Sequence, residues 1–249
     1  MVKIFTKAVF TLLVLNVYVM AHTSVTELQY EGGISLYGKV GIADVKLEED
    51  FTNNTYKMKV TTSSTGLVKK LSSNRKDIYL SEGSIENGTY IPKKFTRLVL
   101  KDEYYKKTTY TFNYQKSEVI KREVSKKVKY ISEFDIDQMK LVGKKTFVEE
   151  DISEYIDFKT NDYLSLFLNL RKGNLKNGAV SYIDKKDKDS VNLINQNLFE
   201  VQKDYGEDVY RICFLNDESI FFKKAVAEDI AFYGDAYIKK IYEKKNIIN

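Results

Sequence analysis

The sequence predicts an all-β, mainly antiparallel protein: one domain built on a strongly curved or barrel-like sheet, with one short helix. Segments of alternating apolar and polar residues recur about every ten residues, which is typical of sandwiches and barrels. Of 249 residues, 19 are Tyr and 14 are Phe, whereas only one is Pro. Aromatic residues favour strands, and few prolines leave the ladder hydrogen bonds intact. Several glycines fall inside the predicted strands, where they indicate bulges or sharp bends.

Strands dominate the first half of the chain. Two are predicted between Thr26 and Asp50, and a turn at 51–55 leads into the alternating segment Tyr56 to Val60. Gly66 to Leu71 is apolar and short, which predicts a single helical turn. Asn87-Gly88 is a favoured hairpin turn. The remaining strands of this half are predicted at Asp77–Glu82, Lys94–Leu100, Lys106–Tyr114 and Glu118–Ile131.

The second half contains the one principal helix. Ser132 to Asp157 is acidic with a weak pattern, which predicts a loop or crossover. From Thr160 to Leu170 the period becomes helical, with Asn161 or Asp162 available as the N-cap and Gly173 as the stop. We find no repeats and no proline-rich linker, so a single domain is predicted. Further strands are predicted at Ala179–Ile183, Val191–Gln202, Val209–Leu215 and Ser219–Val226, with a last segment at Ala236–Glu243.

The N-terminus has the features of a secretory signal peptide. Lys3 and Lys7 precede the apolar segment Ala8 to Met20, and Val19 and Ala21 fit the cleavage rule. The alternative is a permanent membrane anchor. Thirteen helical residues rise only about 20 Å, short of a hydrocarbon core of about 30 Å. Cleavage after Ala21 is therefore predicted, with residues 1–21 as the signal peptide and 22–249 as a single β-rich periplasmic domain.

The single cysteine and the charge pattern narrow the class of protein. Cys213 is far from the cleavage site, so a lipoprotein is not predicted, and one cysteine cannot form an internal disulfide. Its segment predicts a strand with a buried structural thiol. The net charge of +5 is spread over lysine pairs that have acids nearby. A nucleic-acid partner is not predicted, because such a protein gathers its charge into one patch.

The common catalytic devices are missing from the sequence. The only histidine is His22, at the predicted mature N-terminus, which excludes the usual triads and zinc sites. Two acidic runs, Glu48 to Asp50 and Glu149 to Asp151, could hold a hard cation, but solvated strand ends explain them better. Tyr104 to Lys107 mixes aromatic residues with cations, which we interpret as a strand and its turn. The sequence thus predicts a protein that is not an enzyme, with no catalytic, cofactor-binding or metal-binding residues.

Three segments resemble an exported bacterial family, domain-of-unknown-function family 3108. The first is Leu28 to Tyr30 with Leu36 to Gly41, the second is Gly83 to Phe95, and the third is Asp162 to Arg171. The third segment is followed by Leu175 and Gly178, as in the family, although Tyr163 replaces the usual proline after the aspartate. Through the order and spacing of these segments, the resemblance covers the chain from about Glu27 to Glu243. The resemblance implies a periplasmic or envelope protein with a strongly bent antiparallel sheet, and it implies no reaction.

Two functions of different classes follow from these observations. The first is a binding module whose curved, aromatic-rich sheet shelters an apolar ligand, such as a lipid or an acyl chain. The alternative is a structural or assembly partner of other envelope proteins, which needs an exposed apolar patch or an open sheet edge. A hydrolase is a distant third. Whether the aromatic side chains fill the interior or leave a cavity would decide between the first two, because small barrels are commonly packed solid.

Overall fold

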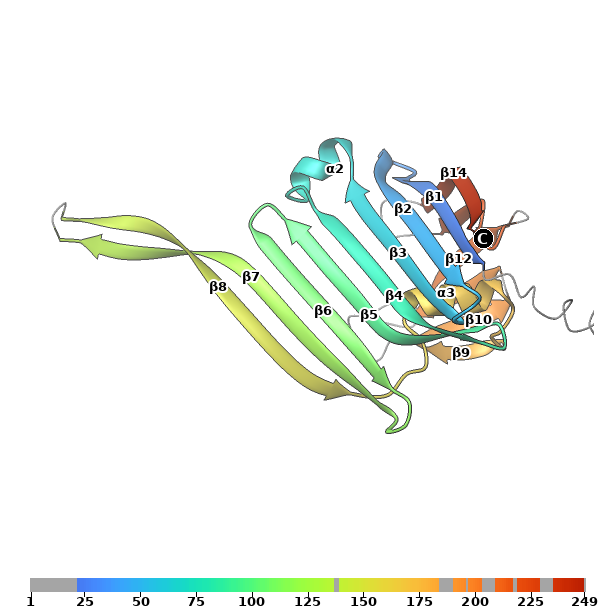
Figure 1. Ribbon diagram of the computed structural model, residues 1–249. Helices are drawn as coiled ribbons and strands as arrows, with labels where there is room; N and C mark the ends of the chain where they lie inside the picture. The colour runs from blue at the N-terminus through green and yellow to red at the C-terminus, as the bar shows by residue number, and fades with distance from the viewer. Residues whose placement is uncertain are drawn as a thin grey trace, which may run out of the picture.

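Over the residues that the structure describes, the fold is a single large antiparallel sheet with two short helices (Figure 1). The computed structural model describes residues 22–136, 139–183, 190–195, 197–202, 209–216, 219–228 and 235–248. The predicted signal peptide and its cleavage point after Ala21 lie outside these residues. The helices are α2 (Gly66–Leu71) and α3 (Tyr163–Arg171). The strands are β1 (Thr23–Ile34), β2 (Gly38–Asp50), β3 (Thr55–Ser64), β4 (Lys76–Glu86), β5 (Thr89–Lys101), β6 (Tyr104–Asn113), β7 (Glu118–Asp135), β8 (Lys140–Ile156), β9 (Gly178–Ser181), β10 (Ser190–Asn195), β11 (Leu198–Gln202), β12 (Val209–Leu215), β13 (Lys224–Ala227) and β14 (Ala236–Ile248).

The strand order divides the sheet into two meanders. It runs β8-β7-β6-β5-β4-β3-β2-β1-β14-β13-β12-β11-β10-β9, so the meanders meet where β1 pairs with β14. The all-β, mainly antiparallel fold is therefore confirmed. The sheet is open, with β8 and β9 as its terminal strands, and it is neither closed nor strongly curled. The predicted barrel-like closure is not confirmed.

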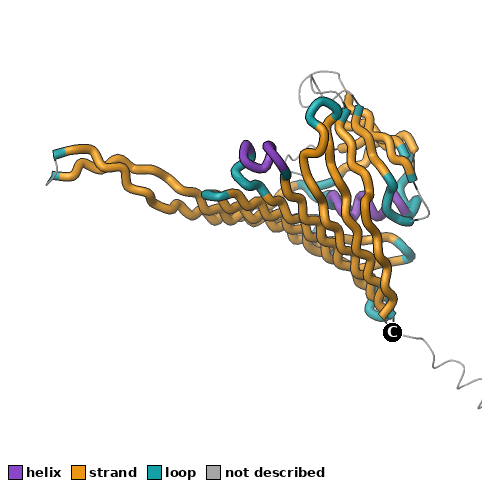
Figure 2. Tube along the Cα trace, turned by 90° about the horizontal axis from the view of Figure 1, so that it is seen from above, coloured by secondary structure: helices purple, strands orange, loops and turns teal. Residues whose placement is uncertain are grey.

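The segment between β8 and β9 carries α3 onto one face of the sheet (Figure 2). Asp162 caps this helix by accepting hydrogen bonds from the backbone amides of Leu164 (2.7 Å) and Ser165 (3.0 Å). The Ser165 hydroxyl in turn accepts from the Asp162 amide, which completes a capping box. Gly173 follows the helix with a φ of 73°. The predicted helix, its cap and its stop are confirmed.

The core lies between α3 and the sheet. Along β5, alternate side chains face the helix, and Phe95 at their centre is 1% exposed. Leu164 and Leu168 of α3 pack into the same cluster as Phe95. The predicted hairpin turn before β5 is also confirmed, because Asn87 and Gly88 both have positive φ. None of the helices in the described ranges has the length and apolar character needed to cross a bilayer.

The predicted loop between Ser132 and Asp157 is wrong, because this segment forms the end of β7 and all of β8. Tyr104 at the start of β6 pairs with Lys127, so the pairs from Val128↔Phe147 to Asp135↔Lys140 extend beyond the rest of the sheet. We call this two-stranded extension the ribbon. Figures 1 and 2 show it projecting from the body of the molecule. At about 3.3 Å per residue its eight pairs reach about 26 Å.

Solvent on both faces explains why the sequence pattern of β8 is weak. Where the burial of its side chains is described, β8 has only exposed and half-buried residues, so apolar residues need not alternate with polar ones. Its acids instead lie beside the cations of β7: Lys126 bonds Glu149 (2.7 Å), Arg122 bonds Asp151 and Lys121 bonds Glu154 (2.6 Å). Cross-strand pairs of this kind stabilise a sheet without a hydrophobic face.

Three strand boundaries near the C-terminus also differ from prediction. The single strand predicted at Val191–Gln202 is a hairpin, in which the Asn195 side chain accepts from the Asn197 amide between β10 and β11. The strand predicted at Ser219–Val226 is shorter, because 219–223 leaves the sheet to bury Phe221 and Phe222. The last strand extends to Ile248, since it pairs along the full length of β1.

Candidate functional site

Buried hydrogen bonds fix one side of α3 to β4 and β5. The Ser81 hydroxyl on β4 donates to the Asp162 carboxylate (2.7 Å) and lies 2.8 Å from the Tyr56 hydroxyl. At the other end of the helix, the Asn169 side chain makes two hydrogen bonds to the backbone of Tyr90 on β5, at 2.8 and 2.9 Å. Buried polar groups that find partners specify one arrangement, so this side of the helix has a fixed position.

The carboxyl group of Asp162, which caps α3, has a raised pKa. The carboxyl is completely buried, and burial raises its pKa to about 6, against the lowering effect of the hydrogen bonds from Ser81, Ser165 and Leu164. Raised pKa values occur at catalytic sites, but they also occur in structural networks. Here one carboxylate oxygen accepts hydrogen bonds from the backbone amides of Leu164 and Ser165, and the other accepts one from the Ser81 hydroxyl. Asp162 is therefore an anchor for α3.

The other side of α3 borders an apolar cavity of about 260 Å³. Leu166 and Phe167 of the helix form one wall, and Val180 of β9, Val191 and Leu193 of β10 and Ile212 of β12 form the other. The remaining lining residues are also aliphatic or aromatic, and only Tyr163 and Tyr182 carry a side-chain polar atom. A dry apolar cavity of about 150 Å³ already binds benzene, and ligand pockets begin at about 300 Å³. This cavity can therefore hold a small apolar group or part of a chain.

Aromatic side chains fill the space next to the cavity. Phe167 lies 5.9 Å from Phe221 and 5.7 Å from Phe222, measured between ring centroids. Tyr163 lies 5.1 Å from Tyr182 at the opposite end. The interior is thus packed where α3 meets β4 and β5, and it is hollow where α3 faces β9, β10 and β12.

The acidic runs considered for a cation have protein partners. Glu49 is buried and accepts a 2.5 Å hydrogen bond from Tyr90, which corrects its interpretation as a solvated side chain. Asp50 caps the following turn through the amides of Thr52 and Asn53. Glu149, Glu150 and Asp151 pair with cations of β7. Among the described residues, no group of three or more His, Cys, Asp or Glu side chains is placed to hold a metal ion.

The other residues singled out from the sequence lie away from the cavity. His22 precedes β1, and its ring centroid is 4.8 Å from that of Phe51. Tyr104 opens β6 after a turn at Asp102-Glu103, which confirms the interpretation as a strand and its turn. Cys213 lies in β12 as predicted, but its side chain is half-buried rather than buried. It alternates with the cavity-lining Ile212, so the two side chains point to opposite faces of the sheet.

Fold and site together define an open, single-sheet β protein with an apolar cavity beside its crossover helix. No protein-family model matches this chain, and no curated protein matches its sequence. The sequence did carry one signal for the cavity, which is that α3 is apolar on two sides. Leu164 and Leu168 bury one side, whereas Leu166 and Phe167 face the cavity. The cavity residues of β9, β10 and β12 could not be found this way, because their position depends on distant pairing.

Proposed function

We propose that this chain is an exported, non-enzymatic binding module that shelters an apolar ligand, such as a lipid or an acyl chain, in the periplasm. The observation that carries the proposal is the cavity beside α3, whose lining is aliphatic and aromatic, with the hydroxyl groups of Tyr163 and Tyr182 as its only side-chain polar groups. Export rests on the predicted signal peptide at residues 1–21, and an envelope role agrees with the resemblance to domain-of-unknown-function family 3108. Residues 22–249 form the binding domain.

The energetics of such a cavity favour a chain over a polar metabolite. Each methylene that leaves water contributes about 0.8 kcal/mol, so four of them contribute about 3 kcal/mol. A polar ligand group would lose its hydrogen bonds to water and find only the hydroxyl groups of Tyr163 and Tyr182.

A barrel-like arrangement of the sheet around α3 is part of the same proposal. Helix α3 contacts β4 and β5 on one side and lines a cavity with β9, β10 and β12 on the other. We propose that the two meanders flank the helix as the walls of an incomplete barrel would, with the ligand replacing part of the packed interior.

Filling the cavity tests the proposal. Val180→Phe is expected to abolish binding of the neutral fluorescent probe N-phenylnaphthylamine, because the larger ring occupies the space of the ligand. Val128→Phe, the same change on the ribbon, is the matched control and should leave binding intact. Native mass spectrometry of protein purified from the periplasm without detergent, with solvent extraction, identifies a natural ligand. A clean mass, no extractable lipid and no binding of the probe by the wild type would contradict the proposal.

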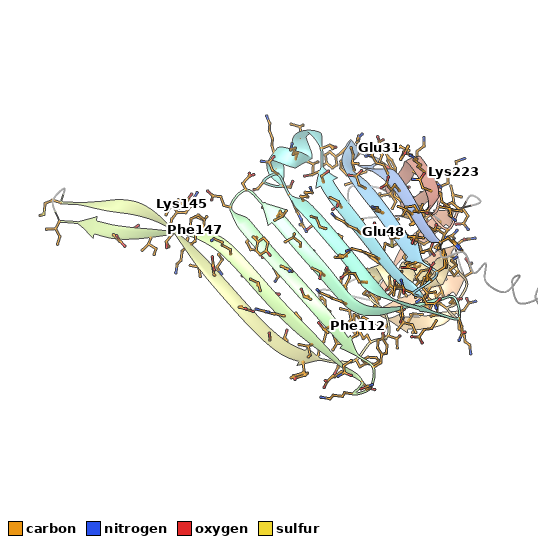
Figure 3. The ribbon with its side chains drawn as sticks, in the orientation of Figure 1. Glu31, Glu48, Phe112, Lys145, Phe147 and Lys223 are labelled. Carbon is orange, nitrogen blue, oxygen red and sulfur yellow. The ribbon has the colours of Figure 1, made fainter. Side chains whose placement is uncertain are left out.

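The ribbon favours a second function, as a structural or assembly partner of other envelope proteins. Tyr130 and Phe147 are 67% and 60% exposed on it, and Figure 3 shows Phe147 on the ribbon. Among the described strands, β8 is the last of the sheet on its side, so its outer edge has no partner strand there. Exposed aromatic groups and an open edge suit the addition of a partner strand. A variant in which a two-residue Asn-Gly turn replaces residues 129–146 separates the two functions. Loss of an envelope phenotype with full probe binding would favour the assembly role.

A further inference from the structure

A second cavity, of about 500 Å³, lies on the same face of the sheet as α3. Phe95, Arg97, Val99 and Lys101 alternate along β5 on that face, and the Phe95 ring lies 6.0 Å from Tyr163 of the helix. Of these four residues, Arg97, Val99 and Lys101 line the cavity, and Phe95 does not. The cations that line it are Arg75, Arg97, Lys101, Lys106 and Lys121, and the one acid that lines it is Glu123.

Two of these cations have no acidic partner. Arg75 pairs with Asp77 (2.8 Å), Lys106 with Glu123 and Lys121 with Glu154 (2.6 Å). Within the described part of the chain, Arg97 and Lys101 make no ion pair. The pocket therefore holds positive charge that the surrounding carboxylates do not balance.

Arg97 carries the more specific sign of a site for an anion. Its Nε atom is buried and has no hydrogen-bond partner in the residues that the structure describes. Its guanidinium lies 5.7 Å from the centroid of the Tyr79 ring, which holds the group over the cavity face of β4. A buried donor on a charged group is costly to leave unsatisfied, and native proteins rarely do so. An anionic oxygen in the pocket would supply the acceptor.

Aromatic rings join this cationic pocket to the apolar cavity. The Tyr79 ring beside Arg97 is 6.3 Å from the Tyr163 ring, and Tyr163 lines the apolar cavity. Tyr110, which lines the cationic pocket, stacks on Phe95, and Phe95 contacts Tyr163 as well. The half-buried rings of Tyr79 and Tyr163 thus lie between the cationic pocket and the apolar cavity, which share no lining residue.

We propose that the ligand is a single-chain anionic amphiphile. Its head group, a carboxylate or a phosphate, binds Arg97 and Lys101, and its chain passes Tyr163 into the cavity beside α3. This inference rests on the proposed function and adds the chemistry of the head group. The two free cations supply charge-assisted hydrogen bonds, which are stronger than neutral ones and distinguish an acid from the matching alcohol.

Competition among three ligands with the same chain tests the inference. Dodecanoate, dodecyl phosphate and dodecanol are titrated against bound N-phenylnaphthylamine. We expect at least one of the two anions to displace the probe at a concentration about tenfold or more below that of dodecanol. The stronger anion identifies the head group as carboxylate or phosphate. Equal displacement by dodecanol and both anions would overturn the inference and leave the proposed function standing, whereas a wild type that does not bind the probe would remove the proposed function itself.

Charge removal assigns the effect to the pocket. Arg97→Gln is expected to erase the advantage of the anions while affinity for dodecanol stays the same. Arg122→Gln is the matched control, because Arg122 lies on β7 with its side chain on the opposite face, bonded to Asp151. Lys101→Gln, at an exposed position, gives a second test if Arg97→Gln fails to fold. An unchanged preference for the anions in both Arg97→Gln and Lys101→Gln would contradict the assignment.

Discussion

The body of the sheet and the ribbon are built from the same antiparallel pairing, yet different forces hold them. In the body, Phe95 on β5 and Leu168 on α3 are buried in one cluster. In the ribbon, Tyr130 and Phe147 are exposed, and Lys145 bonds Glu103 across the surface. Figure 3 shows Lys145 and Phe147 on the ribbon. Burial of apolar area contributes far more free energy than exposed ion pairs do. Strand pairing alone therefore says little about how stable a segment is.

The largest expected difference comes from removing one phenyl ring in each region. Phe95→Ala should lower the free energy of unfolding by about 3–5 kcal/mol, because it leaves a cavity in the core. Phe147→Ala, in the ribbon, should change it by about 0.5 kcal/mol or less. Urea denaturation followed by circular dichroism measures both variants. Similar losses in the two variants would show that the ribbon is packed in solution and would remove the contrast.

The anchor of α3 makes the stability of the body depend on pH. Burial raises the pKa of Asp162 to about 6, so between about pH 4 and pH 6 the folded protein holds a proton that the unfolded chain has released. Stability from this group is complete below about pH 4 and is lost as the pH rises through 6. The side chain in Asp162→Asn stays neutral. The free energy of unfolding of this variant should therefore rise relative to that of the wild type by up to about 3 kcal/mol between pH 4 and pH 7.

Thermal denaturation across that pH range checks this expectation. Asp151→Asn is the control, since Asp151 is exposed on β8 and its pKa is lowered by the hydrogen bond from Arg122. A difference between Asp162→Asn and the wild type that stays constant with pH would show that Asp162 does not titrate in this range.

Glycine substitutions give the smallest expected contrast between the two regions. Gly83 lies at a bulge between β4 and β5, where an added methyl group would collide with the backbone carbonyl of Ile91. Gly83→Ala should cost about 1–3 kcal/mol. Gly143, in the ribbon, has no atom within 4 Å of the same position, so Gly143→Ala should cost about 0.5 kcal/mol or less. Equal unfolding midpoints for the two variants would be the contrary result.

The sequence predicted the elements that have one buried face and failed where that face is missing. Tyr56 to Val60 alternates because β3 covers the core, and α3 was found because its period and its cap agree. β8 was missed since both of its faces meet solvent. The turn within Val191–Gln202 was missed because a short asparagine turn interrupts an otherwise continuous strand pattern. The cavity and the cationic pocket depend on segments brought together by pairing far apart in the chain, which a local pattern does not contain.

The free edge of β8 also governs how one molecule meets another. An edge of 17 residues with unpaired backbone groups invites a second copy to continue the sheet. An antiparallel copy centred between Asp151 and Ile152 would bring Glu149 opposite Glu154, and one centred on Asp151 would place that residue opposite itself. The acids that join β8 to β7 within a molecule therefore repel a second molecule at the same edge. High salt screens this repulsion, so we expect crowded molecules to continue the sheet from one copy to the next under that condition, while a strand rich in lysine meets no such barrier.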